Sequence, residues 1–227
     1  MQYKYLRHNK LHDRLILFVN GWGIDERPFL FLQTTEQADV VVVYDYDSFN
    51  LEPGFYQLVK SYSKIDVIAW SFGVWYFNHI AEMTDKWNQI IYVNGTLTPI
   101  DRQKGIPPAI FRLTLSGLDE NSLLKFYRNM FISERDYDRF MKNKPRLPFA
   151  RIRAQLQWFE GAVINSSGAS GITPNAIIIG QKDRIFPVNN LHQAWSQSEN
   201  IIVENTGHFP FYHWNSWEEI IDVANNQ

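Results

Sequence analysis

Three side chains that could act together in nucleophilic catalysis each follow a run of residues typical of a buried strand. They are Ser71, Asp183 and His208. A serine hydroxyl is a poor nucleophile at its own pKa, but a histidine can remove its proton and a carboxylate can orient that histidine. Because the carboxyl ends of parallel strands meet at one edge of a sheet, three such residues at strand ends predict acyl transfer through a covalent serine intermediate.

Each of the three also has an ordinary structural explanation. A serine between small residues after a strand is often a turn residue, Asp183 could cap a helix or turn, and His208 could be a packed loop histidine. Asp101, after the preceding predicted strand, is a second candidate for the acid. The catalytic assignment therefore depends on what surrounds each residue.

The segment around Ser71 has the spacing of a sharp strand-to-helix turn. In KIDVIAWSFGVWYFNHI (64–80) the apolar run stops at Ser71, and Ala69 and Gly73 keep the positions two before and two after it small. Larger side chains would collide in so tight a turn, which would hold the serine in a strained conformation with its hydroxyl above the sheet edge. The segment resembles the nucleophile elbow of α/β-hydrolases, usually written G-x-S-x-G, from which Ala69 departs. The chain order serine, aspartate, histidine is also theirs.

A glycine-rich loop, NGWG (20–23), follows the strand predicted at 14–20. It resembles the α/β-hydrolase loop that supplies the first oxyanion-hole amide, with Asn20 in place of the usual histidine. The alternative is a tight turn that needs positive φ. The resemblance implies that the backbone amides of Trp22 and Phe72 would stabilise the oxyanion.

The pattern of elements predicts an α/β fold with a mostly parallel sheet and helices on both faces. The predicted strands are 2–7, 14–20, 39–44, 65–70, 89–93, 176–180 and 200–204. Between 97 and 170 the alternation stops and helical spacing recurs. We therefore expect an α/β-hydrolase core (1–96 and 171–227) with an inserted helical cap or lid (97–170), and SSGASG (166–171) as a return linker.

Composition excludes several classes of protein. With 227 residues, 45% of them hydrophobic, the chain can bury one sizeable core. The absence of cysteine excludes disulfides, thiolate metal sites and a cysteine nucleophile. A net charge of −2 argues against nucleic-acid binding. We expect a cytoplasmic protein without a membrane span, because no signal-like or long apolar run occurs. An aromatic share of 15% fits either an apolar pocket or a bulky core.

Charge is unevenly distributed along the chain. Residues 125–153 contain nine Lys or Arg against three acidic residues, a net +6 that leaves −8 for the remainder. This pattern fits either a solvated helical face or a docking surface for an acidic partner.

Several short motifs of the sequence together resemble those of one family. They are NGWG, YDY, AWSFGVW, NGT followed by PID and GIPP, LKFYRNMF, GQKDRIFP and GHFPF, between Asn20 and Phe211. These motifs resemble those of the BioG-type pimeloyl-[acyl-carrier-protein] methyl ester esterases of biotin synthesis. The resemblance implies hydrolysis of the methyl ester at the far end of the carrier-bound chain, with methanol leaving, the thioester intact and neither metal nor cofactor needed. It implies a triad of Ser71, Asp183 and His208, with oxyanion amides from Trp22 and Phe72.

The implied partner is acyl carrier protein, which is acidic, and this favours the docking interpretation of the basic segment. Helical spacing on one face makes Arg128, Arg135, Arg139 and Arg146 the candidate contacts. Two other functions remain open at this point: a broad-specificity carboxylesterase acting on free short-chain esters, and a non-catalytic binding protein of hydrolase fold.

Overall fold

The computed structural model describes residues 1–9, 13–34, 38–165 and 172–225, and its centre is a seven-stranded sheet. The strands lie in the order β1-β3-β2-β4-β5-β6-β7, and every pair is parallel except β1 with β3. Their bounds are β1 Gln2–Arg7, β2 Arg14–Val19, β3 Asp39–Tyr44, β4 Lys64–Trp70, β5 Trp87–Val93, β6 Ala176–Gly180 and β7 Ile201–Glu204. The parallel strands β2, β3, β4 and β6 are almost wholly buried, and β5 is buried over its last four residues, as expected for strands covered on both faces.

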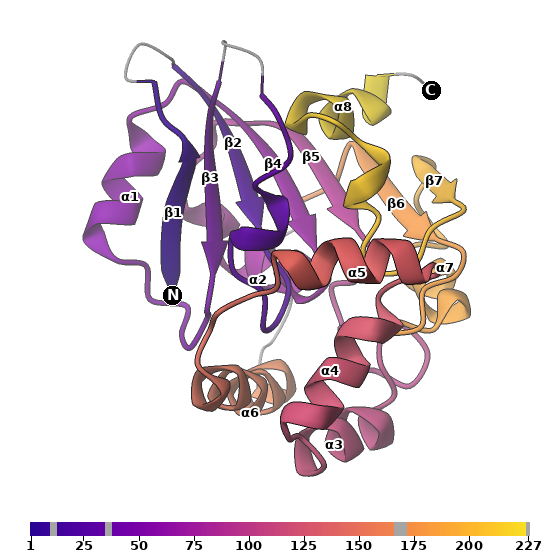
Figure 1. Ribbon diagram of the computed structural model, residues 1–227. Coiled ribbons are helices and arrows are strands. Elements are labelled where there is room, and N and C mark those ends of the chain that lie inside the picture. The colour runs from indigo at the N-terminus through magenta and orange to yellow at the C-terminus, as the bar shows by residue number, and fades with distance from the viewer. Residues whose placement is uncertain (10–12, 35–37, 166–171, 226–227) are drawn as a thin grey trace.

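Helices cover both faces of this sheet (Figure 1). Figure 1 shows α2 (Phe72–Ile80) behind the strands and α8 (Trp217–Asp222) in front of them. On the α8 side, the Phe18 ring of β2 lies 5.0 Å from the Trp217 ring. The other core helices are α1 (Pro53–Lys60) and α7 (Val188–Ala194). The expected α/β-hydrolase fold with a mostly parallel sheet is confirmed.

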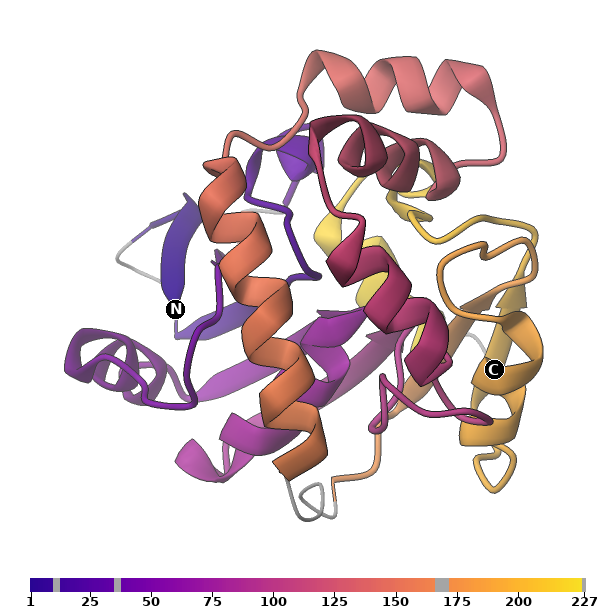
Figure 2. The ribbon, with the colours of Figure 1, turned by 90° about the horizontal axis from the view of Figure 1, so that it is seen from below.

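Four helices stand between β5 and β6, and we call them the inserted helices: α3 (Pro108–Ser116), α4 (Glu120–Asn129), α5 (Glu134–Lys142) and α6 (Phe149–Asn165). Figure 1 places α3, α4 and α6 beyond the carboxyl ends of the parallel strands and α5 in front of those ends. Figure 2, seen from below, shows α3 and α6 as neighbours lying across the strand ends. Side chains of the inserted helices can therefore reach the loops that leave the strands. The expected linker SSGASG (166–171) lies outside the described residues.

Local sequence explains where these helices begin. Asp119 accepts from the Ser122 amide, and the Ser122 hydroxyl accepts from the Asp119 amide, so α4 starts with a reciprocal cap. Ser133 caps α5 by a single bond of this kind, in which its hydroxyl oxygen accepts from the Asp136 amide. Pro108 is the first residue of α3, where its missing N–H costs nothing. Helix α3 is distinct in the structure, although helical spacing alone did not separate it from the irregular stretch around it.

Candidate active site

Ser71 lies at the turn between β4 and α2 with φ 59° and ψ −127°. Few non-glycine residues adopt this left-handed region, so the turn is strained in the way the elbow spacing predicts. A methyl group on Gly73 would lie only 2.1 Å from the Val19 carbonyl oxygen and 2.6 Å from that of Asn20. Ala69 is fully buried in β4 between Val19 and Tyr92. Small residues at these two positions let the elbow pack against the end of β2.

The structure brings Ser71, His208 and Asp183 into one hydrogen-bonded chain. The Ser71 Oγ lies 3.0 Å from His208 Nε2, and His208 Nδ1 lies 2.7 Å from Asp183 Oδ2. All three residues are buried. The other Asp183 oxygen accepts from the amides of Ile185 and Phe186, at 2.7 and 3.0 Å. Both oxygens of the carboxylate are thereby fixed, and the arrangement is one that can activate a serine for attack on an ester carbonyl.

Asp101, the second candidate acid, lies elsewhere. Its Oδ1 accepts from the amides of Gln103 and Lys104, at 2.7 and 2.8 Å, so this carboxylate closes its own turn. Asp183 is therefore the carboxylate that the structure pairs with His208.

The amides of the 20–23 loop have different partners. Gly21 N donates to its neighbour's side-chain oxygen, Asn20 Oδ1, at 2.8 Å, and Gly23 N donates to Gln155 Oε1 of α6 at 3.1 Å. Within the described residues, the structure records no acceptor for the amides of Trp22 and Phe72. The latter is the first residue of α2, where backbone N–H groups lack partners within the helix. Both amides expected to stabilise an oxyanion are thus without a recorded acceptor in the described part of the chain.

Asn20 shows why an asparagine suits the position that histidine usually occupies. Its side-chain amide donates to the carbonyls of Ile24 and Asp25, at 3.0 and 3.1 Å, while its Oδ1 accepts from Gly21. The Tyr46 hydroxyl donates to the Asn20 carbonyl at 2.6 Å. Burial raises the pKa of Tyr46 far above its ordinary value, so the hydroxyl remains a donor. The fully buried Asn20 side chain therefore closes the loop on itself.

The histidine loop is fixed by two side chains from neighbouring strand ends. Asn94, after β5, donates to the carbonyls of Gly207 and His208, both at 3.0 Å, and accepts from Gly180 N at 2.7 Å. The Trp70 indole N–H donates to the His208 carbonyl at 2.8 Å. Asn94 has φ 45° and is buried. This one amide therefore ties the loop that bears His208 to the end of β6, a few residues before Asp183.

A cavity of about 290 Å³ opens above Ser71 between α3 and α4. Trp22, Phe72 and Leu156 lie at its inner end, and Ile110 and Leu113 line its wall. The side chains of Ile110 and Leu113 are 53% and 69% exposed, which is unusual for residues of this size and marks an open apolar rim. The cavity can accept an apolar chain that extends toward solvent.

Two exposed cations, Lys125 of α4 and Arg184 of the Asp183 loop, also line this cavity. Neither was among the four candidate docking residues. Arg184 lies outside the basic segment 125–153 from which the candidate docking residues were taken. The one available signal for it was its place next to the predicted acid, Asp183.

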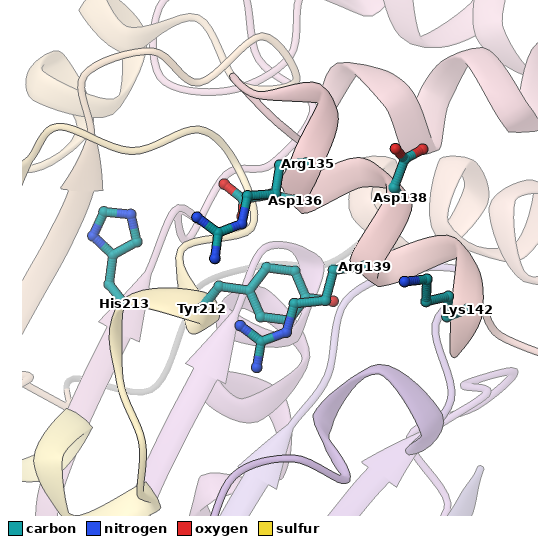
Figure 3. Close-up of a pocket in the computed structure, with 7 residues that line it drawn as sticks. All are labelled: Arg135, Asp136, Asp138, Arg139, Lys142, Tyr212 and His213. Atoms are coloured by element: carbon teal, nitrogen blue, oxygen red, sulfur yellow. The ribbon is translucent and has the colours of Figure 1, made fainter.

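A second, separate groove of about 730 Å³ lies between α5 and the short helix η3 (Phe211–His213). Figure 3 shows Arg135 and Arg139 on the side of α5 that faces Tyr212, and Asp138 pointing away from it. The Arg139 guanidinium lies over the rings of Tyr212 and Phe31, 4.0 and 4.3 Å from their centroids. This groove shares no lining residue with the cavity above Ser71.

The four candidate docking residues differ in what already holds them. Arg128 pairs with Glu134 at 2.6 Å, and Arg139 is stacked on two aromatic rings. Arg135 and Arg146 are exposed, and no hydrogen bond or ion pair of their side chains is recorded among the described residues. Arg135 and Arg146 are the pair free to meet a partner.

Together the fold and the site define an α/β-hydrolase, a hydrolase-type enzyme. Residues 1–220 match the model of the family described as pimeloyl-ACP methyl esterase BioG. The chain therefore belongs to the BioG family.

Two curated proteins are similar to this chain in sequence. A protein of Bacteroides fragilis (strain 638R), described as malonyl-[acyl-carrier protein] O-methyltransferase, is 36% identical over 198 residues, which are 87% of this chain but 39% of that protein. The chain thus spans about two fifths of that relative. An uncharacterized protein of Haemophilus influenzae is 30% identical over 92% of this chain and 95% of its own length.

Solved structures show the same fold. The crystal structure of BioG from Haemophilus influenzae superposes with a TM-score of 0.89 at 28% identity and covers 98% of this chain and 100% of that chain. A bromoperoxidase from Bacillus anthracis has a TM-score of 0.60 at 15% identity and covers 91% of this chain and 87% of its own. At that identity it demonstrates the fold alone. Across the described residues, no helix combines the length and apolar character needed to cross a membrane.

Proposed function

We propose that this chain hydrolyses the methyl ester of pimeloyl-[acyl-carrier protein] methyl ester, with Ser71 as nucleophile, His208 as base and Asp183 as the orienting acid. The observation that carries the proposal is the hydrogen-bonded chain from Ser71 through His208 to Asp183 at the inner end of an apolar cavity. The substrate in this proposal is inferred from the description of the BioG family.

The reaction runs in two halves. His208 Nε2 takes the hydroxyl proton as Ser71 Oγ bonds to the ester carbonyl carbon, and the resulting oxyanion accepts from the amides of Trp22 and Phe72. When the tetrahedral intermediate collapses, the C–O bond to the methoxy group breaks and His208 returns the proton, so methanol leaves. A water molecule then attacks the acyl-serine by the same route and releases the free carboxylate. Asp183 holds the imidazole tautomer and stabilises the imidazolium.

The cavity's dimensions suit a substrate whose other end stays on its carrier. A pimeloyl chain has six C–C bonds between its two carbonyl carbons, about 7 Å when extended, since three backbone bonds span about 3.5 Å. The cavity lining follows α4 from Ser122 to Asn129, about 10 Å along the helix axis. With the methyl ester at Ser71, the thioester would reach the open apolar rim. Lys125 and Arg184 would then lie where the carrier's arm leaves the cavity, and their charges would attract the acidic carrier.

We propose further that the inserted helices, with their flanking loops (97–170), act as a cap on a core formed by 1–96 and 171–227, and that the carrier docks on this basic cap. Arg135 and Arg146 would make the first contacts, because Arg128 and Arg139 already have partners. The groove in Figure 3 mixes Arg135, Arg139 and Lys142 with two aspartates, so its net charge is small. We therefore expect the docking to depend on individual arginines more than on a uniform field.

Hydrolysis of carrier-bound and free methyl esters by wild type and Ser71→Ala tests the proposal. We expect Ser71→Ala to lose at least 10³-fold in kcat on both, and the wild type to prefer the carrier-bound ester. Near wild-type hydrolysis by Ser71→Ala would overturn the nucleophile assignment. Equal kcat/KM for the two esters would favour the broad-specificity carboxylesterase instead. Failure of a fluorophosphonate to label Ser71 would favour a binding protein.

A further inference from the structure

The loop that presents the Trp22 amide is held by the inserted helices rather than by the sheet alone. Three hydrogen bonds cross to it. Gly23 N donates to Gln155 Oε1 at 3.1 Å, the Trp22 indole N–H donates to the Ile152 carbonyl at 2.8 Å, and the Tyr127 hydroxyl donates to the Gly23 carbonyl at 3.1 Å. Burial raises the pKa of Tyr127, so its hydroxyl stays a donor.

Gln155 differs from the other two partners because it decides which amide is left without an acceptor. The loop carries three amides in sequence, and Gly21 N already bonds to Asn20. By accepting from Gly23 N, the Gln155 side chain fixes the next peptide plane and leaves Trp22 N as the remaining donor. Gly23 has φ 70°, and a glycine tolerates several other backbone conformations as well. The orientation of this peptide group therefore depends on the hydrogen bond to Gln155.

The cost of placing Gln155 there supports a specific role. The residue is 1% exposed, and its Nε2 atom is buried with no hydrogen-bond partner among the described residues. An unpaired buried N–H group is destabilising, so an apolar residue would serve the packing of α6 better. Only the oxygen of this side chain has a partner, and that partner is the oxyanion loop.

We infer that Gln155 is a positioning residue, which acts through Gly23 to aim the Trp22 amide at the oxyanion. This rests on the proposed function, in which that amide stabilises the tetrahedral intermediate. Its effect should fall on the chemical step, because the interaction strengthens as the oxyanion forms.

Two variants separate this role from simple packing. Gln155→Leu removes the acceptor at similar size, whereas Gln155→Glu keeps an acceptor oxygen and replaces only the unpaired Nε2. Gln157→Leu, on the exposed side of the same helix, is the matched control. Thermal melting of each variant establishes that it is folded. Kinetics are measured on a small p-nitrophenyl ester, with fluorophosphonate labelling of Ser71 as a second readout.

For Gln155→Leu we expect kcat to fall about 10- to 100-fold with KM within about 3-fold, somewhat less than the 10²- to 10³-fold cost of losing an oxyanion donor outright. Fluorophosphonate labelling should slow in parallel. A buried carboxyl group ionises reluctantly, so Gln155→Glu should be close to wild type at low pH and lose activity as the pH rises and a negative charge forms beside the oxyanion. Gln157→Leu should behave as wild type.

Unchanged kcat in folded Gln155→Leu would overturn the inference, as would a loss confined to KM. A loss in Gln155→Glu equal to that of Gln155→Leu at every pH would also overturn it, because the acceptor would then be irrelevant. These results are distinct from failure of the proposed function. That failure would appear as hydrolysis and labelling that survive Ser71→Ala in an otherwise wild-type chain.

Discussion

Replacing Asn94 should test whether the histidine loop is held as the structure indicates. Asn94→Ala removes the partner of Gly180 N and of the Gly207 carbonyl, whereas the His208 carbonyl keeps its bond from the Trp70 indole. Two buried backbone groups would be left unsatisfied, at about 1 to 3 kcal/mol each, for a total of about 2 to 6 kcal/mol. Alanine at φ 45° adds about 1 kcal/mol, because asparagine tolerates this region better.

Urea unfolding of Asn94→Ala and Asn94→Gly, beside wild type, measures these contributions. Both variants lose the same hydrogen bonds, but glycine tolerates positive φ, so the difference between them isolates the backbone strain at about 1 kcal/mol. We expect kcat to fall about 10²-fold in both, since a shift of about 1 Å in His208 would lengthen its bond to Ser71.

The reasoning would be refuted if Asn94→Ala unfolded within about 1 kcal/mol of wild type with kcat unchanged. The loop would then be positioned by Trp70 and its own packing. If stability fell as expected but the folded protein kept full activity, only the claim that Asn94 positions His208 for catalysis would be refuted.

The remaining predictions concern charge. Lys125→Glu, Arg184→Glu and Arg135→Glu should each lower kcat/KM for the carrier-bound ester about 3- to 10-fold at low salt, an effect that shrinks as salt is raised. A small free ester should be spared, and Lys64→Glu, at the amino end of β4, is the control; equal losses on both esters would contradict docking. Arg151→Met should destabilise the fold by about 1 kcal/mol, since Arg151 is 40% exposed but pairs with the buried Asp45 as well as Asp47. Burial raises the pKa of Asp47, but hydrogen bonds from the N-terminal amine and Arg151 outweigh it and hold that pKa below 3.8. Such a depressed pKa contributes stability that is present above about pH 4 and lost as pH falls through the lowered value. The difference in Tm between wild type and Arg151→Met should therefore become smaller as the pH is lowered. A Tm difference that does not change with pH would contradict the pairing of Arg151 with Asp47.

Local patterns in the sequence predict the core of this fold well. Each predicted strand appears within about two residues of its expected bounds. The reason is that the burial of a parallel strand on both faces demands a continuous apolar run, which is visible without knowing the strand's neighbours. The neighbours themselves are not visible: β1 pairs with β3 rather than with β2, the strand that follows it in sequence.

The same distinction separates the site residues that could be predicted from those that could not. Ser71, Asp183 and His208 sit in turns whose own sequence constrains them, such as Gly73 against the Val19 carbonyl. Arg184 is read as a cavity residue only once α3 and α4 have been placed across the strand ends.

For Gln155, helical periodicity predicts that the side chain is buried but not which group it contacts. It is three residues after Ile152 and four before Phe159, so helical spacing alone puts it on the buried face of α6. A glutamine on an apolar face needs a partner, which is a signal that the sequence does contain. The partner, Gly23 N, is 132 residues away and belongs to the peptide backbone, which carries no sequence signature of its own. Positioning residues that act on backbone groups therefore become visible only in the folded chain, even when their burial can be predicted.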